Sequence, residues 1–107
     1  MITTSLNFSQ LDAKTFSSML KDKPGMIIDI RTPGEYAENH IHNAINIDFY
    51  SMDFEDQLKQ LDKSTPIYIY CRTGSRTKIA IEILKKLDFK EAYDLKGGII
   101  AWEVNNF

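Results

Sequence analysis

Short apolar runs alternate with helix-like patterns along the chain. The two clearest runs, residues 26–31 and 67–71, are bounded by turn-forming residues and predict buried strands. Shorter runs predict two further strands over residues 44–47 and 92–95. Strands that alternate with helices predict an α/β fold with a mainly parallel central sheet flanked by helices.

Capping signals predict where the first two helices begin. Ser9 has the character of an N-cap for a helix that ends before Pro24, with an apolar face formed by Leu11, Phe16, Met19 and Leu20. The segment from Thr32 to Glu35 resembles a capping box with Pro33 at the first helical position. Both helices are expected to serve as scaffold.

Apolar residues at three- and four-residue spacing predict the other helices. One covers residues 52–61, and a short closing helix containing Trp102 follows the break at Gly97 and Gly98. The helix after the 67–71 strand is predicted to carry an apolar stripe of Ile79, Ile83, Leu84 and Leu87.

The composition is that of a small globular domain. Of 107 residues, 43% are hydrophobic, and no linker or repeat divides them, so we expect one domain over residues 1–107. A net charge of −2 with both signs interspersed argues against a general binder of nucleic acids or anionic membranes. Residues 1–5 lack a leader pattern, and no apolar stretch is long enough to span a bilayer. These features predict a soluble cytoplasmic protein.

The single cysteine begins the loop Cys71-Arg72-Thr73-Gly74-Ser75-Arg76, between a predicted strand and a predicted helix. A thiol there would face the unpaired N–H groups of the first helical turn, the positive end of the helix dipole and two arginines, which all favour the thiolate. Cys71 is therefore a candidate nucleophile. The alternative is a cysteine that only packs in the core, but such a residue needs neither a loop of backbone donors nor local positive charge.

Three charged residues lie at the end of the first predicted buried strand or shortly after it. Asp29 and Arg31 are two residues apart, so in an extended strand they point to one face, and Glu35 follows one short turn later. We expect a structural role, in which a buried ion pair between Arg31 and Glu35 holds the loop after the strand. Direct contact with substrate is the alternative, and Asp29 could instead orient the Cys71 loop.

His40 and His42 do not form a recognised metal-binding pattern. They are two residues apart, without a third clear ligand or a nearby cysteine. An imidazole in a turn more often makes local hydrogen bonds. We therefore predict no metal site.

Four ordered motifs run along nearly the whole chain: residues 28–36 (IDIRTPGEY), 40–47 (HIHNAINI), 71–76 (CRTGSR) and 93–102 (YDLKGGIIAW). Their order and spacing resemble those of the single-domain rhodaneses. The resemblance implies a rhodanese-like three-layer α/β domain with an active-site cysteine that carries a sulfane sulfur as a persulfide. It places Cys71 as the nucleophile within a loop that supplies N–H groups and positive charge around the substrate, formed by Arg72, Thr73, Gly74, Ser75 and Arg76.

The activity that this resemblance implies is sulfur transfer. The sulfur would come from a small anionic donor, either thiosulfate or a persulfide or polysulfide, and would pass to an external acceptor such as cyanide, a thiol or a protein. Since no second cysteine can resolve a persulfide on Cys71, the acceptor must come from outside. No metal or organic cofactor is implied.

Several positions depart from the family pattern. His42-Asn43 stands where Pro-Gly is common and Asn39 where Gly is common, so we expect a differently shaped turn without loss of catalysis. Glu35 and Thr73 occupy positions at which two-domain thiosulfate transferases tend to carry basic residues. This difference argues against thiosulfate as the physiological donor.

Two other functions are compatible with the same resemblance. Small domains of this kind also serve as non-catalytic interaction or regulatory modules, a role that loss of the cysteine would indicate, and Cys71 is present. Related phosphatases and arsenate reductases carry Cys-x5-Arg, whereas Cys71 to Arg76 is Cys-x4-Arg. The shorter ring of amides is expected to suit a sulfur atom on the cysteine better than a tetrahedral phosphate.

Overall fold

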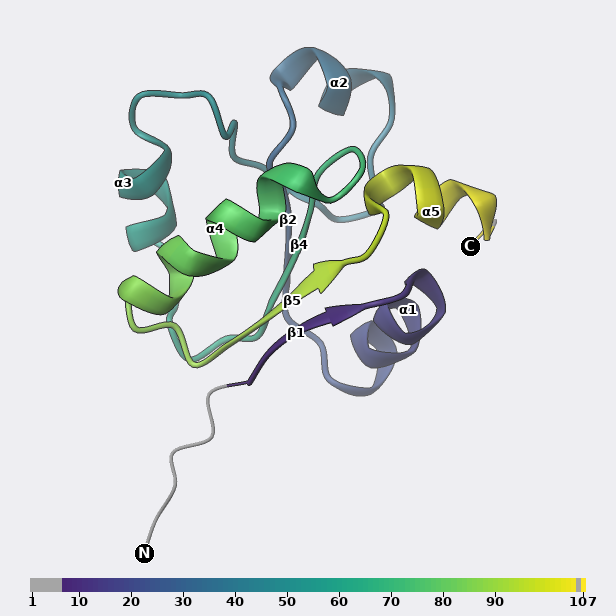
Figure 1. The fold of residues 1–107 in the computed structure, drawn as a ribbon, viewed down its shortest axis with the longest axis horizontal. Helices are drawn as coiled ribbons and strands as arrows, with labels where there is room; N and C mark the ends of the chain where they lie inside the picture. The colour runs from purple at the N-terminus through teal and green to yellow at the C-terminus, as the bar shows by residue number, and fades with distance from the viewer. Residues whose placement is uncertain (1–6, 106) are drawn as a thin grey trace, which may run out of the picture.

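The computed structural model describes residues 7–105 and 107, which form a twisted sheet between two layers of helices (Figure 1). The five strands are ordered β1-β5-β4-β2-β3, and all four neighbouring pairs are parallel. The α/β fold with a parallel central sheet is thus confirmed. The strand bounds are β1 Asn7–Leu11, β2 Met26–Asp29, β3 Ile45–Asn46, β4 Ile67–Tyr70 and β5 Glu91–Leu95.

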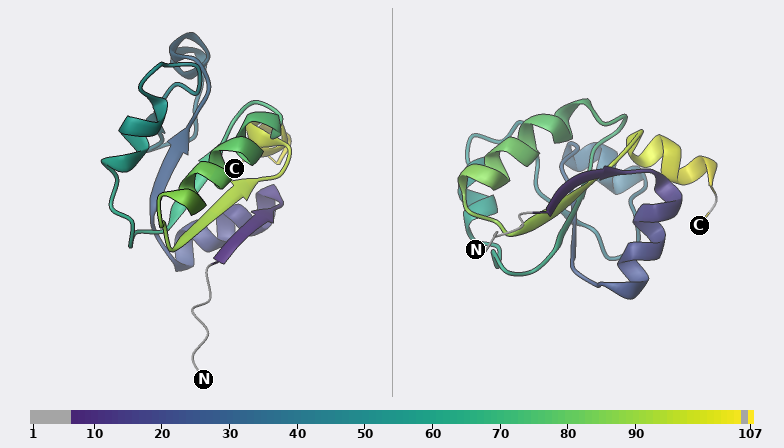
Figure 2. Two further views of the ribbon diagram at one scale, coloured as in Figure 1. Left: turned by 60° about the vertical axis from the view of Figure 1, so that its left-hand side comes forward. Right: turned by 60° about the horizontal axis from the view of Figure 1, so that its bottom comes forward.

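Helices cover both faces of the sheet, as buried parallel strands require. The right-hand view of Figure 2 shows α4 on one side of the strands and α1 on the other. One apolar core lies beneath α3 and α4, and the second lies beneath α1 and α5. The helix bounds are α1 Ala13–Asp22, α2 Pro33–Glu38, α3 Phe54–Lys59, α4 Ser75–Lys86 and α5 Gly98–Val104.

The first strand is a correction to the sequence analysis. Ser9 is not an N-cap: it lies in β1, which pairs with β5 over its whole length, from Asn7 opposite Glu91 to Leu11 opposite Leu95. Helix α1 is instead capped by Asp12, whose carboxylate accepts a hydrogen bond from the Thr15 N–H at 2.8 Å. Pairing with a strand more than eighty residues later, which no local pattern encodes, decides the structure of this segment.

Other local predictions differ in detail. The capping box of Thr32 and Glu35 with Pro33 at the helix start is present as expected. Strand β2 ends at Asp29, two residues earlier than predicted. Ile79 was expected on the buried stripe of α4 but is 56% exposed, because Thr77, Ala80 and Leu84 form the buried face.

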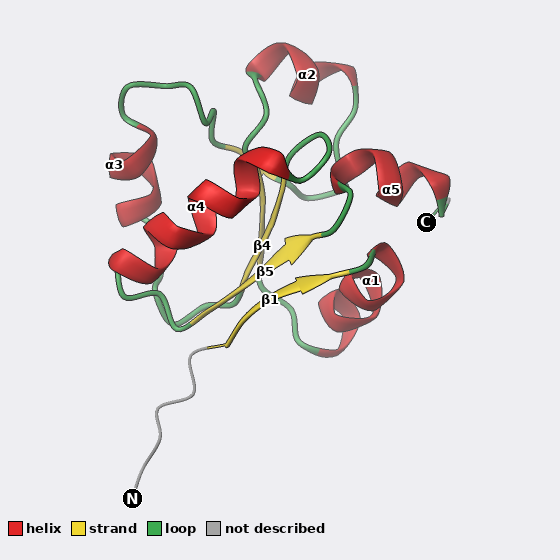
Figure 3. Cartoon of the chain, viewed as in Figure 1, coloured by secondary structure: helices red, strands yellow, loops and turns green. Residues whose placement is uncertain are grey.

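The carboxyl ends of the central strands carry the segments in which ligands usually bind in parallel sheets. Figure 3 shows the loop between β4 and α4 beside the segment that enters α5, with α2 above them. This places the Cys71 loop at that end. None of the described helices combines the length and the apolar content needed to cross a membrane. Residues 1–5, in which the sequence shows no leader pattern, lie outside the described part of the chain.

Candidate active site

Cys71 follows the last residue of β4 and is fully buried beneath its loop. The loop turns at Gly74, whose φ of 108° is available to glycine at little cost. The Gly74 N–H donates to the Cys71 Sγ over 3.1 Å, and Sγ lies 4.0 Å from the Thr77 hydroxyl. That hydroxyl donates in turn to the Gly74 carbonyl at 2.9 Å. The loop is therefore wrapped around the sulfur atom.

The first residues of α5 donate backbone hydrogen bonds to the same loop. The Ile99 N–H donates to the Cys71 carbonyl at 3.0 Å, and the Ile100 N–H donates to the Arg72 carbonyl at 3.4 Å. Gly98 makes this close approach possible, because a Cβ at that position would lie 2.3 Å from the Arg72 carbonyl oxygen. Gly98, the second glycine of the 93–102 motif, thus allows α5 to pack directly against the Cys71 loop.

We expect Gly98→Ala to disrupt the candidate site. The added methyl would meet backbone atoms and strain a residue with φ +60°, at a cost of about 3 kcal/mol of unfolding free energy. Denaturant unfolding measures this cost. Gly34→Ala is the matched control, since a Cβ there meets nothing within 4 Å, and equal destabilisation by both substitutions would contradict the role of Gly98 in this close packing.

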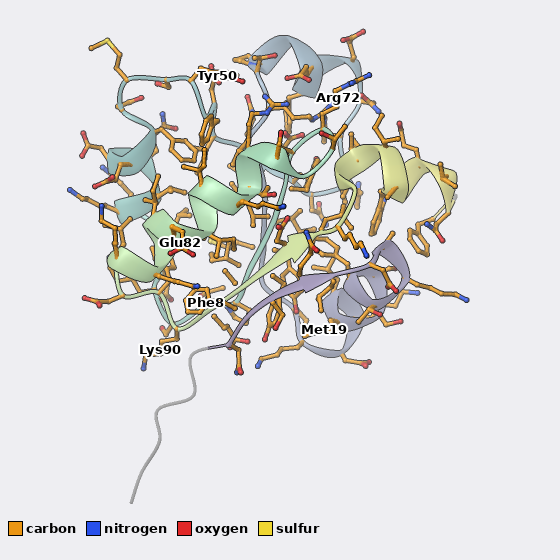
Figure 4. The ribbon with its side chains drawn as sticks, in the orientation of Figure 1. Phe8, Met19, Tyr50, Arg72, Glu82 and Lys90 are labelled. Carbon is orange, nitrogen blue, oxygen red and sulfur yellow. The ribbon has the colours of Figure 1, made fainter. Side chains whose placement is uncertain are left out.

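The two loop arginines occupy different surroundings. The Arg76 guanidinium lies 3.4 Å from the Glu35 carboxylate and 5.6 Å from the centre of the Tyr50 ring, and its side chain is 15% exposed. Arg72 is exposed and lies below α2, as labelled in Figure 4. Burial acts to raise the pKa of Glu35, but hydrogen bonds from Thr32 and Arg76 outweigh it, so that the pKa is lowered. Arg76 thus joins α2 to the loop, whereas Arg72 faces the solvent.

These surroundings predict different effects of removing the two arginines. We expect Arg76→Ala to lower the melting temperature and turnover, because it leaves Glu35 without its ion-pair partner. The lowered pKa of Glu35 means that this stabilisation is present above the ordinary glutamate pKa and is lost as the pH falls through the lowered value.

Arg72→Ala is expected mainly to raise the KM for an anionic donor, since it removes an exposed cation and leaves the packing unchanged. Steady-state kinetics and melting curves of both variants test the division of roles. Equal losses of melting temperature, or an unchanged KM in Arg72→Ala, would contradict it.

The charged residues near the end of β2 pair differently from the prediction. Arg31 does not pair with Glu35: its guanidinium lies 2.8 Å from the Asp29 carboxylate, and Glu35 bonds to Arg76 instead. Both members of the Asp29–Arg31 pair are buried, and the Tyr70 hydroxyl donates to the same carboxylate at 2.7 Å. Asp29 and Arg31 are close on one short segment, so the Arg31 guanidinium reaches the carboxylate in a fork of hydrogen bonds.

The Asp29–Arg31 network extends to the loop after α2. Arg31 also donates to the Asn39 carbonyl, and the Tyr70 hydroxyl accepts from the Ile41 N–H at 3.0 Å, so the loop after α2 is tied to the sheet. Burial acts to lower the pKa of Arg31, but its bonds to Asp29 outweigh this and the pKa is raised. Burial, together with Asp29, raises the pKa of Tyr70 above its ordinary value. Asp29 is thus linked to the Cys71 loop through Tyr70, the residue before the cysteine.

The remaining predicted loop residues lie on the outer side. Thr73 and Ser75 are exposed and, with Gly74 and Lys78, line a cavity of 460 Å³. The sequence analysis missed two contributors, Thr77 beside the sulfur and Tyr50 beside Arg76. The position of Thr77 in the first turn of the helix after Cys71 was a signal that could have identified it.

The histidines are placed as local residues. His40 stacks on Tyr36 with ring centres 3.8 Å apart, and its Nδ1 lies 2.8 Å from the Tyr36 carbonyl, which agrees with the hydrogen-bonding role expected of a turn histidine. His42 is exposed. Within residues 7–105 and 107, no group of three potential metal ligands is gathered.

Complete burial of Cys71 agrees with a packing cysteine, whereas other features of the loop do not follow from packing. A packing role gives no reason for an N–H donor aimed at the sulfur, or for a loop that bends through a positive φ to supply it. Such a donor stabilises negative charge on sulfur. The arrangement suits a sulfur nucleophile.

Comparison with known proteins decides the family. A profile of the rhodanese-like domain family matches residues 12–105, which include every predicted site residue. The chain belongs to the rhodanese-like domain family. A rhodanese-related protein of Thermoplasma volcanium has the same fold, with a TM-score of 0.81 and 25% identity over 92% of this chain and 94% of its own. A rhodanese-like domain protein of Staphylococcus aureus gives a TM-score of 0.77 and 29% identity, over 88% and 90%.

Curated relatives of this rhodanese-like domain include two kinds of protein. A protein named sulfurtransferase from Allochromatium vinosum is 30% identical over 88% of this chain and 87% of its own length. A tRNA uridine(34) hydroxylase of Pelagibacter ubique is 33% identical over 91% of this chain. The chain spans about a third of the length of that hydroxylase. The two kinds together support a sulfur-related enzyme.

Proposed function

We propose that this rhodanese-like domain is a sulfurtransferase, in which Cys71 carries a sulfane sulfur as a persulfide between a donor and an external acceptor. The observation that carries the proposal is the Gly74 N–H aimed at the Cys71 Sγ over 3.1 Å, within a loop that also bears Arg72 and Arg76. A sulfurtransferase relative that matches almost end to end supports it.

In the first half of the cycle, Cys71 attacks the donor. The thiolate forms a new bond to the outer sulfur of thiosulfate, or to a sulfane sulfur of a persulfide or polysulfide, and the bond between that atom and its former partner breaks. The electron pair of the broken bond leaves with sulfite or with the released thiolate. Exposed Arg72 would attract the anionic donor, while the Gly74 N–H would stabilise negative charge at the sulfur.

In the second half, an acceptor attacks the outer sulfur of the persulfide. Cyanide is converted to thiocyanate in this step, and a thiol is converted to a persulfide. The electron pair of the broken S–S bond stays on the Cys71 sulfur, which becomes a thiolate again. The chain has one cysteine, so no second thiol of the same chain takes up the sulfur. The cycle is therefore ping-pong, and its steps need only Cys71 and the two external reactants.

The charges around the loop bear on the choice of donor. Glu35 engages Arg76, and neither Glu35 nor Thr73 is basic, so of the two loop arginines Arg72 is the one left to attract a donor. Thiosulfate carries a sulfonate group, whose oxygens are held best by several cationic hydrogen-bond donors, whereas a persulfide or polysulfide has no such group at the reacting sulfur. We therefore propose a persulfide or polysulfide as the better donor and thiosulfate as the poorer one.

Rates of thiocyanate formation test the proposal. The protein is supplied with cyanide and with thiosulfate, inorganic polysulfide or glutathione persulfide in turn, and hydrolysis of an aryl phosphate is measured alongside. We expect thiocyanate from each sulfur donor, with the higher kcat/KM for polysulfide or persulfide, and negligible phosphate release. Efficient phosphate release without sulfur transfer would overturn the proposal in favour of phosphatase chemistry, and neither activity would favour an interaction module.

A further inference from the structure

Three buried residues form a closed ring of hydrogen bonds around the candidate nucleophile. The Gly74 N–H donates to the Cys71 Sγ at 3.1 Å, and the Thr77 hydroxyl donates to the Gly74 carbonyl at 2.9 Å. The sulfur closes the ring, because as a thiol it donates toward the Thr77 hydroxyl oxygen at 4.0 Å. Gly74 is therefore held at both of its polar groups, its N–H by the sulfur and its carbonyl by Thr77.

Gly74 has little restraint of its own. It lies at φ 108° and ψ −5°, a left-handed conformation that glycine adopts at little cost and leaves as easily. It is also the N-cap of α4, where it offers no side chain to accept from the first turn of the helix. A change of either dihedral angle would turn the N–H away from the sulfur. The hydrogen bond from Thr77 fixes the carbonyl, so it restrains the direction of the N–H.

Packing does not account for a hydroxyl at position 77. Thr77 is fully buried in the first turn of α4, and the other buried residues of that helix, Ala80 and Leu84, are apolar. A buried hydroxyl is costly unless it is hydrogen-bonded, and valine would fill the same space without that cost. The bond to the carbonyl three residues earlier also selects one of the two side-chain rotamers that threonine adopts in a helix. The Thr77 hydroxyl proton is thus committed to the Gly74 carbonyl.

We propose that Thr77 is a positioning residue, which holds the Gly74 carbonyl so that the Gly74 N–H stays aimed at the Cys71 sulfur. The catalytic consequence of this role rests on the proposed sulfur-transfer function. A fixed N–H donor stabilises negative charge at the sulfur when the thiolate attacks the donor, and again when the thiolate is released from the persulfide. Thr77 is buried and acts through Gly74, so its loss should slow both half-reactions without weakening the binding of the donor.

Steady-state sulfur transfer from inorganic polysulfide to cyanide tests this consequence. We expect Thr77→Val, which keeps the shape but not the hydroxyl, to lower kcat roughly tenfold while the KM for polysulfide stays unchanged. Thr77→Ser keeps the hydroxyl and should restore most of kcat. Thr15→Val is the matched control, because Thr15 is exposed on α1, on the opposite side of the sheet, and this variant should match the wild type. A wild-type kcat in Thr77→Val, an effect on KM alone, or a Thr77→Ser variant as slow as Thr77→Val overturns the proposal.

Hydrogen exchange of the Gly74 amide, followed by NMR on the reduced protein, measures the restraint on the N–H directly. We expect slow exchange in the wild type and in Thr77→Ser, and exchange roughly tenfold faster in Thr77→Val, because the loop opens more often without the bond to the carbonyl. Equal protection in all three proteins overturns the proposal. Thr77→Ala repeats both measurements if the valine variant melts below the assay temperature. Exchange requires no sulfur donor, so a protein that shows this pattern without sulfur transfer refutes the proposed function and supports the positioning role.

Discussion

Replacement of Cys71 by serine is expected to reduce thiocyanate formation to the uncatalysed background. A hydroxyl has almost the volume of a thiol and can still accept the Gly74 N–H, but it cannot carry a sulfane sulfur. The fold should therefore persist while the activity is lost. Thiocyanate formation and the melting temperature of the same preparation measure the two effects.

Asp88→Asn, a substitution of an exposed residue at the far end of α4, is the control and should retain wild-type turnover. Sulfur transfer that persists in Cys71→Ser would exclude a persulfide on this residue. Loss of the folded state in that variant would instead support the packing role of Cys71.

Removing Arg31 should have the largest effect on stability of the substitutions considered. Its side chain is 4% exposed beside an Asp29 carboxylate with no exposure at all. Arg31→Ala therefore leaves an uncompensated buried charge, and we expect a loss of about 3–5 kcal/mol in the free energy of unfolding. In the same change the loop at Asn39 loses the hydrogen bond from Arg31, and the Tyr70 ring loses the guanidinium that lies over it. Urea unfolding at neutral pH measures the loss.

Lys59→Ala provides the comparison for that experiment, because Lys59 forms an exposed ion pair with Asp56 at 3.8 Å. Its removal should change the unfolding free energy by less than about 0.5 kcal/mol. Similar effects of the two substitutions would show that the buried pair contributes no more than a surface pair. That result would contradict the structural role assigned to the Asp29–Arg31 network.

Features encoded by neighbouring residues could be predicted from the sequence. The capping box of Thr32 and Glu35 depends on residues three apart, and the buried strand β4 is a continuous apolar run. Cys71 could be placed at a turn between a strand and a helix for the same reason. The family resemblance rested on motifs of this local kind, and the match over residues 12–105 confirms it.

Features decided by distant contacts could not be predicted. Strand β1 exists because β5 offers it a parallel partner, and its own burial pattern shows no regular alternation. Glu35 and Arg76 are 41 residues apart, so their ion pair follows from the packing of α2 against the Cys71 loop. Asp94 looked like part of an ordinary strand, and only the packing of the sheet shows that its carboxylate is buried.

The most direct test of the central claim is mass spectrometry of the intact protein after exposure to polysulfide or thiosulfate, followed by peptide mapping. We predict the addition of one sulfur atom, located on the peptide containing Cys71, and its removal by cyanide with formation of thiocyanate. Cys71→Ser treated in parallel should gain no sulfur. Wild-type protein that gains no sulfur on Cys71 from thiosulfate, polysulfide or a persulfide donor would contradict the account.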